Sequence, residues 1–150
     1  MQLQRESNPA LNTVTAYGSD YIEINEVSFR HAVYFGPEGE VHEWPVQNVQ
    51  DITAEVLRAL VGMAERRAGP MAFLDSDAAP HTKPEGCPEV VLVGTGAAQH
   101  LLPASVTAPL LQAGIGIEAM STQAAARTYN ILMSEGRRVV VALLLQKEAA

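Results

Sequence analysis

The sequence predicts one α/β domain over residues 1–150, with a mixed central sheet flanked by helices and a small amino-terminal antiparallel meander. Three observations support this fold class. The first 45 residues hold short apolar segments separated by turn residues. Apolar residues then recur at helical spacing after residue 50, and the second half of the chain alternates apolar runs with helix-like segments. Strand–helix–strand units of this kind build parallel sheets.

Short strands are expected near the amino terminus. Asn25-Glu26 predicts a tight turn between two of them, and residues 36–39, Gly-Pro-Glu-Gly, predict a second turn. We expect residues 1–45 to form one small antiparallel sheet, with residues 1–12 as a flexible amino-terminal segment. The expected strands lie within residues 21–25, 27–29, 32–35 and 41–44.

Trp44 lies close in sequence to Tyr34 and Phe35. These aromatic residues fit packing between the two predicted sheets, and they also fit an exposed contact surface. The sequence leaves both interpretations open.

A helix is expected after residue 50. Asp51 or Thr53 can cap its start, and Gly69-Pro70 ends it. The proline-rich residues 75–88 are expected to form a loop. The apolar residues of the helix share one face: Ile52, Val56, Leu60 and Met63.

The second half predicts three strands and two helices. The first helix covers residues 103–113 and is closed by Gly114. Ser121 or Thr122 caps the second helix, which runs to about Ser134 with Gly136 just past its end. The last strand is apolar throughout, so we expect it in the middle of the sheet with both faces covered. The three strands lie within residues 89–93, 115–120 and 139–145.

Composition excludes several classes of protein. The chain has 150 residues, 47% of them hydrophobic, so it can bury a core without a disulfide or metal. The net charge of −7 argues against a nucleic-acid partner. The longest apolar run has seven residues, far fewer than the roughly 20 that span a bilayer. The polar amino terminus and the single cysteine, Cys87, lead us to expect a cytoplasmic protein.

The sequence holds no complete catalytic set. His81 and Cys87 share the proline-rich loop, but two ligands do not make a metal site, so we expect no metal and no cofactor. This lack of a set favours a non-enzymatic role. The histidines are scattered, without a pair at ligand spacing: His31, His42, His81 and His100.

Gly94, Thr95 and Gly96 follow the first strand of the second half, where open α/β sheets bind ligands. The third glycine of a dinucleotide fingerprint is missing, because Gln99 stands in its place. The motif therefore fits either a ligand-contacting turn or a structural turn that needs small residues.

The second helix carries a polar stripe of Arg127, Asn130 and Ser134. Arg127 and Arg137 could together bind an anion. The alternative is an ion pair between Arg137 and Glu135 that closes the helix end.

Five segments carry a resemblance that runs from about residue 10 to 146. The chain resembles the Mth-type domain family of unknown function (domain of unknown function four-nine-eight), which includes mitochondrial complex I assembly factor three and the adipogenesis-associated Mth-type domain protein. The carboxyl-terminal segments, in this order and at these spacings, are specific, whereas residues 75–87 match no family motif. The segments are Tyr17–Asn25, Glu89–Gly96, Gly116–Thr122, Ala125–Leu132 and Glu135–Arg138.

The resemblance implies a three-layer β/β/α domain and no established enzymatic activity. The best-described relative helps to assemble the respiratory NADH dehydrogenase, so we expect a non-enzymatic interaction or assembly module with a protein partner, such as one in respiratory or membrane-protein assembly. The alternative is a small-molecule or anion-binding protein, or an unrecognised enzyme, that uses the Gly94–Gly96 turn and nearby arginines. The family motifs add these candidate site residues: Gly94, Gly96, Arg127, Asn130, Glu135 and Arg137.

Overall fold

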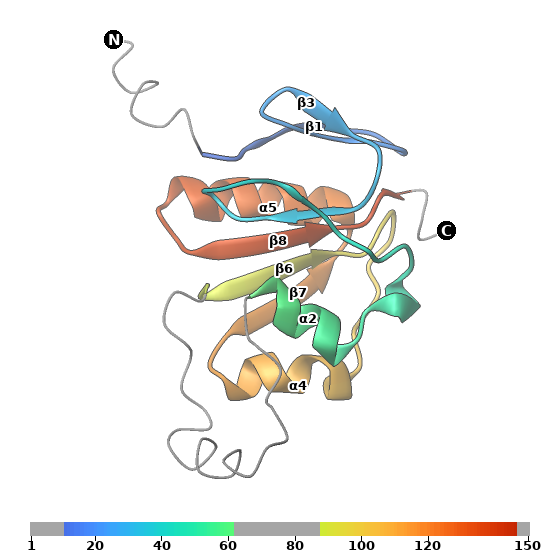
Figure 1. The fold of residues 1–150 in the computed structure, drawn as a ribbon, viewed down its shortest axis with the longest axis vertical. Coiled ribbons are helices and arrows are strands. Elements are labelled where there is room, and N and C mark those ends of the chain that lie inside the picture. The colour runs from blue at the N-terminus through green and yellow to red at the C-terminus, as the bar shows by residue number, and fades with distance from the viewer. Residues whose placement is uncertain (1–10, 62–87, 147–150) are drawn as a thin grey trace.

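The computed structural model describes residues 11–61 and 88–146 and confirms the predicted α/β class. A five-stranded mixed sheet forms the middle layer. A three-stranded antiparallel sheet lies on one side of it next to helix α5, Thr122–Ser134, and helices α2, Ala54–Leu60, and α4, Ala104–Gln112, lie on the other side (Figure 1). The described residues therefore form the three layers that the family resemblance implies.

The small sheet contains β1, Val14–Tyr17, β2, Ile22–Ile24, and β3, Val27–Phe29, in that order. Asn25 and Glu26 connect β2 to β3 with φ angles of 51° and 71°. Two positive φ values in a two-residue loop are typical of the hairpin turn whose twist matches antiparallel strands. The predicted tight turn is confirmed.

The next two strands correct the predicted meander. Strands β4, Val33–Phe35, and β5, His42–Glu43, do not continue the small sheet but join the large one, where β4 pairs antiparallel with β8, Val139–Leu143. Val33 and Phe35 are buried on one face of β4, and Tyr34 is half-buried on the other. A strand covered on both faces fits the middle layer better than an outer sheet.

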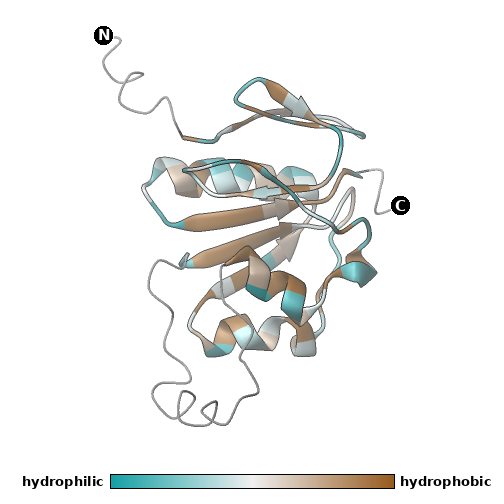
Figure 2. Ribbon diagram, viewed as in Figure 1, coloured by the Kyte–Doolittle hydropathy of each residue, from teal (hydrophilic) through white to brown (hydrophobic). Residues whose placement is uncertain are grey.

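The parallel part of the main sheet contains β6, Val90–Gly94, β7, Gly116–Met120, and β8. The strand order is β5-β4-β8-β6-β7, so β8 lies in the middle, as its apolar sequence predicts. Figure 2 shows β6 and β8 as hydrophobic along most of their length. Helix α4 connects β6 to β7, and α5 connects β7 to β8.

The helix ends follow the predicted capping residues. Thr53 Oγ1 accepts a hydrogen bond from the Val56 amide at the start of α2, and Ser121 Oγ accepts one from the Ala124 amide at the start of α5. Gly136, just after α5, has a φ of +81°, which favours glycine. A short 3₁₀ turn, η1, Val49–Asp51, precedes α2.

Several predicted features lie outside the described residues. They are the end, at Gly69-Pro70, of the helix expected after residue 50, and the proline-rich loop up to residue 87 with its His81 and Cys87. At the amino terminus, Asn12 is buried and donates through Nδ2 to the Gly36 and Gly39 carbonyls. Asn12, which we expected in the flexible segment, is therefore held by hydrogen bonds to the turn at residues 36–39.

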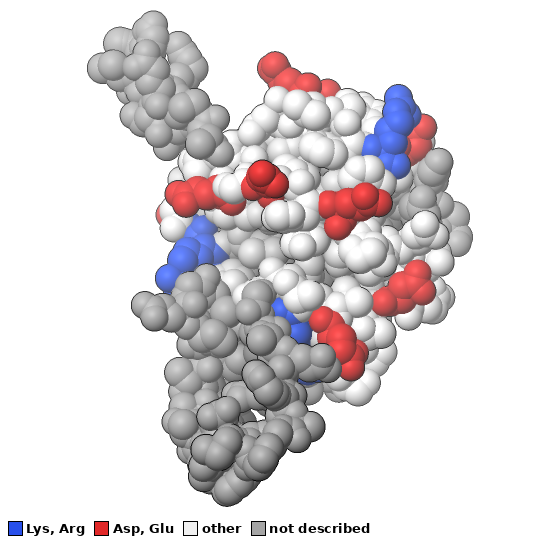
Figure 3. All heavy atoms as spheres, in the orientation of Figure 1, with Lys and Arg blue, Asp and Glu red and all other residues white. Residues whose placement is uncertain are grey.

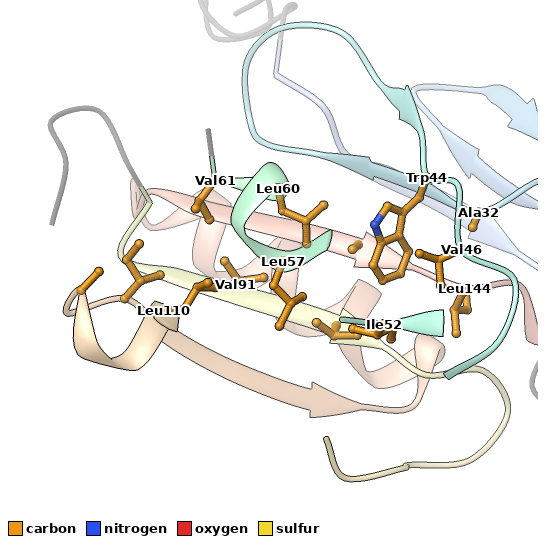
Figure 4. Packing of buried hydrophobic residues seen from close by; sticks show 14 residues of the cluster. Ala32, Trp44, Val46, Ile52, Leu57, Leu60, Val61, Val91, Leu110 and Leu144 are labelled. Carbon is orange, nitrogen blue, oxygen red and sulfur yellow. The ribbon is translucent and has the colours of Figure 1, made fainter. Parts of the chain in front are cut away.

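Each face of the main sheet carries its own hydrophobic core. The core under α2 and α4 contains Trp44, which lies in one cluster with Val46 and Leu57 (Figure 4). Phe35 and Tyr129 lie in the other core, with ring centroids 5.1 Å apart, between the main sheet, α5 and the small sheet. Trp44 therefore packs against helices. Both predictions for it, packing between the two sheets and an exposed contact surface, are wrong.

Within residues 11–61 and 88–146, no helix has the length and hydropathy of a membrane span.

Candidate functional site

The structure separates the predicted site residues along the main sheet. Gly94–Gly96 lies at the carboxyl end of β6, whereas Glu135 and Arg137 lie next to the amino end of β8. Arg127 and Asn130 lie between these positions on α5. Because β6 and β8 are parallel and five residues long, the two ends are separated by roughly 17 Å. A small ligand at one end does not contact the other.

Gly94 occupies a position where a side chain would not fit. A Cβ atom built on it would lie 2.8 Å from Thr122 Cα and 2.8 Å from Leu143 Cδ2. Both distances are shorter than real carbon contacts, so the absence of a Cβ allows the start of α5 to approach β6 closely. Gly94 is thus explained by packing between a strand and a helix.

Thr95 and Gly96 direct their hydrogen-bonding groups into the protein. Thr95 is fully buried, and its Oγ1 lies 2.7 Å from the Ala98 carbonyl oxygen and accepts a hydrogen bond from the His100 amide. The Gly96 amide donates to Thr122 Oγ1, which in turn donates to a carbonyl at the end of β8. These contacts hold the loop that follows the motif in one conformation.

That loop begins a stretch of the chain, residues 97–114, whose exposed described residues carry no charge, and we call these residues the uncharged surface. Its eleven exposed residues include no Asp, Glu, Lys or Arg, whereas 12 of the other 30 exposed residues described are charged. Leu101 and Leu111 are 82% and 55% exposed on it. The sequence signal for this surface was the run from Val90 to Ile117, which holds no charged residue. The members are Ala97–Leu101, Pro103–Ser105, Leu111, Gln112 and Gly114.

Asn130 binds the small sheet. Its Oδ1 accepts a hydrogen bond from the Val14 amide at 3.0 Å, and its Nδ2 donates to the Val14 carbonyl at 2.9 Å. The side-chain amide therefore pairs with β1 as a neighbouring strand would. Arg127, three residues earlier on α5, is exposed.

Arg137 pairs with Glu89 and not with Glu135. Its Nε lies 2.9 Å from Glu89 Oε1, and both side chains are nearly half exposed. The predicted ion pair between Arg137 and Glu135 is therefore wrong. Gly136 turns the chain from α5 into β8, which lies beside β6, and this brings Arg137 to the residue that precedes β6.

A pocket of about 540 Å³ lies beside this ion pair. Its walls are the end of α5, the start of β8 and the turn at residues 36–38. Its lining residues include three charged ones, Glu38, Arg137 and Arg138. The face of the molecule in Figure 3 shows more acidic than basic side chains among the described residues.

Tyr129 is a titratable group in the core between α5 and the small sheet. Burial raises the pKa of its phenol, whose hydroxyl donates to the Asn12 carbonyl at 2.7 Å.

Among the residues with described positions, no group of three or more His, Cys, Asp or Glu side chains could hold a metal ion.

Two solved structures of Bordetella proteins are similar to this chain. A crystal structure from Bordetella parapertussis is 56% identical, with 91% of this chain and 97% of that chain covered and a TM-score of 0.73. A solution structure from Bordetella pertussis, described as an Mth938-like domain, is 58% identical, with 92% and 88% covered and a TM-score of 0.72. These likenesses agree with the observed fold.

Curated relatives extend the comparison. An uncharacterised protein of Rhodobacter capsulatus is 48% identical over 56 residues, 37% of this chain and 45% of that protein. The bovine NADH dehydrogenase [ubiquinone] 1 alpha subcomplex assembly factor 3 is 31% identical over 142 residues, 95% of this chain. The chain spans 65% of that bovine protein. The family described as "Protein of unknown function (DUF498/DUF598)" matches residues 14–144, which confirms the resemblance seen in the sequence motifs. The chain therefore belongs to the DUF498/DUF598 family of proteins of unknown function.

Proposed function

We propose that this protein is a non-enzymatic interaction module that takes part in assembling a protein complex, and that the uncharged surface binds its partner. The main observation is the absence of charge from the eleven described residues of this surface, in a chain of net charge −7. The relation to the bovine assembly factor, 31% identical over most of this chain, supports an assembly role.

The composition of the surface fits the centre of a protein interface. Such centres are depleted in charged residues, because a buried charge loses its hydration. Leu101 is 82% exposed and would bury most of its side chain against a partner. Leu111, at the end of α4, offers a second apolar contact.

Hydrogen bonds also hold the loop that follows Gly96 in one conformation without a partner. Thr95 Oγ1 bonds to Ala98 and His100, so the segment that leads to Leu101 is held before a partner arrives. A loop that is already ordered loses less conformational entropy on association. The Gly94–Gly96 motif thus acts in this proposal as a support for the surface, without contacting the partner itself.

The partner is a protein with an uncharged apolar surface, such as a subunit in respiratory or membrane-protein assembly. The acidic remainder of the molecule would favour basic residues around that surface and would speed encounter at low salt. The proposal keeps the cytoplasmic location expected from the sequence, and fractionation of native cells tests it.

Affinity purification from native cells tests the proposal with matched substitutions. Leu101→Asp and Leu111→Asp place a charge in the uncharged surface, whereas Ile131→Asp places one on α5. Leu111 and Ile131 have nearly equal exposure, 55% and 56%, so the variants differ mainly in location.

We expect the wild type and Ile131→Asp to recover the same protein partner and the two leucine variants to lose it. Circular dichroism establishes that each variant is folded. Recovery of the bait alone from repeated wild-type purifications would contradict the assembly role. Undiminished recovery by both leucine variants would contradict the assignment to the uncharged surface.

A further inference from the structure

The pocket at the amino end of β8, which we call the edge pocket, has the composition of a ligand site. Its volume of about 540 Å³ lies within the range of small-molecule sites. Apolar side chains from α5, β8 and two connecting segments form much of its lining: Pro37, Pro88, Met133, Val139 and Val140. An apolar group of a ligand would leave water on entering it.

Hydrogen bonds fix one wall of the edge pocket. Asn12 donates through Nδ2 to the Gly36 carbonyl at 2.9 Å and to the Gly39 carbonyl at 3.0 Å, and its backbone amide donates to the Pro37 carbonyl. The Tyr129 hydroxyl holds Asn12 in turn. The turn at residues 36–39 is therefore anchored to the core, and the wall exists without a ligand.

The opposite wall is fixed as well. The Arg137 amide donates to a carbonyl in the last turn of α5, and the Arg137 guanidinium pairs with Glu89. The Glu89 amide donates to the Arg138 carbonyl at 2.8 Å. The backbone that carries both arginines is thus attached to α5 and to the start of β6.

The charged side chains that line the pocket differ in whether they form an ion pair. Arg137 is neutralised by Glu89. Arg138 is exposed, and its side chain has no hydrogen bond or ion pair within the described part of the chain. Glu38 lines the pocket from the turn, and it forms no ion pair with either arginine. Arg138 is therefore available to a ligand, while Glu38 opposes an anion nearby.

We propose that the edge pocket binds a small organic acid, with its apolar group on the pocket lining and its carboxylate on the Arg138 guanidinium. A guanidinium presents two parallel N–H donors that match a carboxylate. The apolar lining selects against small inorganic anions, which gain nothing from it. None of the residues that line the edge pocket belongs to the uncharged surface, so this site does not depend on the proposed function.

Heteronuclear NMR titrations with three probes test the site. Octanoate carries both the apolar chain and the carboxylate, octanol carries only the chain, and acetate only the charge. We expect octanoate to shift the signals of residues 136–140 and of the Met133 methyl group, and to bind more tightly than either other probe. Added salt should weaken octanoate binding, because it screens the Arg138 charge.

Three variants separate the contributions. Arg138→Ala should weaken octanoate binding about tenfold, as expected for loss of a charge-assisted hydrogen bond. Glu38→Gln should tighten it, because an opposing charge is removed. Arg127→Ala, on the exposed side of α5 and outside the lining, should leave it unchanged.

Equal affinities for octanoate and octanol would refute the role of Arg138, as would unchanged binding by a folded Arg138→Ala variant. Shifts confined to residues away from the edge pocket would refute its location. The absence of any binding at millimolar octanoate would overturn the proposal. None of these results bears on partner recovery through the uncharged surface.

Discussion

Substituting Gly94 tests whether the close approach of β6 and α5 explains the glycine motif. In Gly94→Ala the new methyl carbon would lie 2.8 Å from Thr122 Cα, a backbone atom that cannot move without shifting α5. Inserting a methyl group into a tightly packed core typically costs 1–3 kcal/mol. Displacement of Thr122 also weakens the hydrogen bond that its hydroxyl accepts from Gly96, at a further cost of about 1 kcal/mol.

We therefore expect Gly94→Ala to lower the free energy of unfolding by about 3 kcal/mol, which corresponds to a decrease in Tm of roughly 6–12 °C for a domain of this size. Urea denaturation followed by circular dichroism measures the loss. The matched control is Gly116→Ala in the neighbouring strand β7. A Cβ atom there meets its nearest atoms at 3.6 Å, an ordinary contact.

The control should change the stability by less than about 1 kcal/mol, because its methyl group has room and alanine also reduces the entropy of the unfolded chain. One outcome of this comparison would contradict the packing explanation. If Gly94→Ala and Gly116→Ala unfold at the same urea concentration, the packing explanation for Gly94 is wrong. The motif would then need a different explanation, and ligand contact would again be open.

Three further predictions concern α5 and its ends. Asn130→Ala should lower stability by about 1–2 kcal/mol, because both polar groups of Val14 lose their partner, and amide hydrogen exchange at β1 should rise more than at β6. Arg137→Ala should cost less than about 1 kcal/mol in thermal melts, because the pair with Glu89 is half exposed; a larger loss would mean that the pair fixes the turn. Burial raises the pKa of Tyr129 above its ordinary value of 10, so the folded state favours the protonated phenol. Stability should be constant up to about pH 10 and fall above it, and Tyr129→Phe should show a smaller fall in the same melts.

Local chemistry made much of the second half predictable. Ser121 and Gly136 bound α5 through contacts within a few residues, so the sequence contains the complete signal for both ends. The central position of β8 was predictable for a similar reason. Only a strand covered on both faces can be apolar along its whole length.

Pairing between distant segments was not predictable. Val33 lies opposite Leu143, and no feature near either residue indicates that β4 joins the main sheet and leaves the small one. The contact that holds the outer edge of β1 was not predictable either, because it comes from the side chain of Asn130, 116 residues away from Val14.

The candidate site shows the same limit. Arg137 has Glu135 two residues away in sequence, yet Glu89 becomes its partner because β8 lies beside β6. The uncharged surface differs, since its charge-free run is visible in the sequence. Its exposure became clear only when the structure placed Leu101 outside the core.

The central position of β8 has a consequence for synthesis of the protein. The ribosome makes β4 and β6 first, but both pair with β8, which is the last element of the described chain to be made. Until residues 139–143 emerge, β4 and β6 each present an unpaired apolar edge to solvent. The small sheet contains only neighbouring strands and can pair early. The nascent main sheet is therefore exposed to aggregation until β8 has been made.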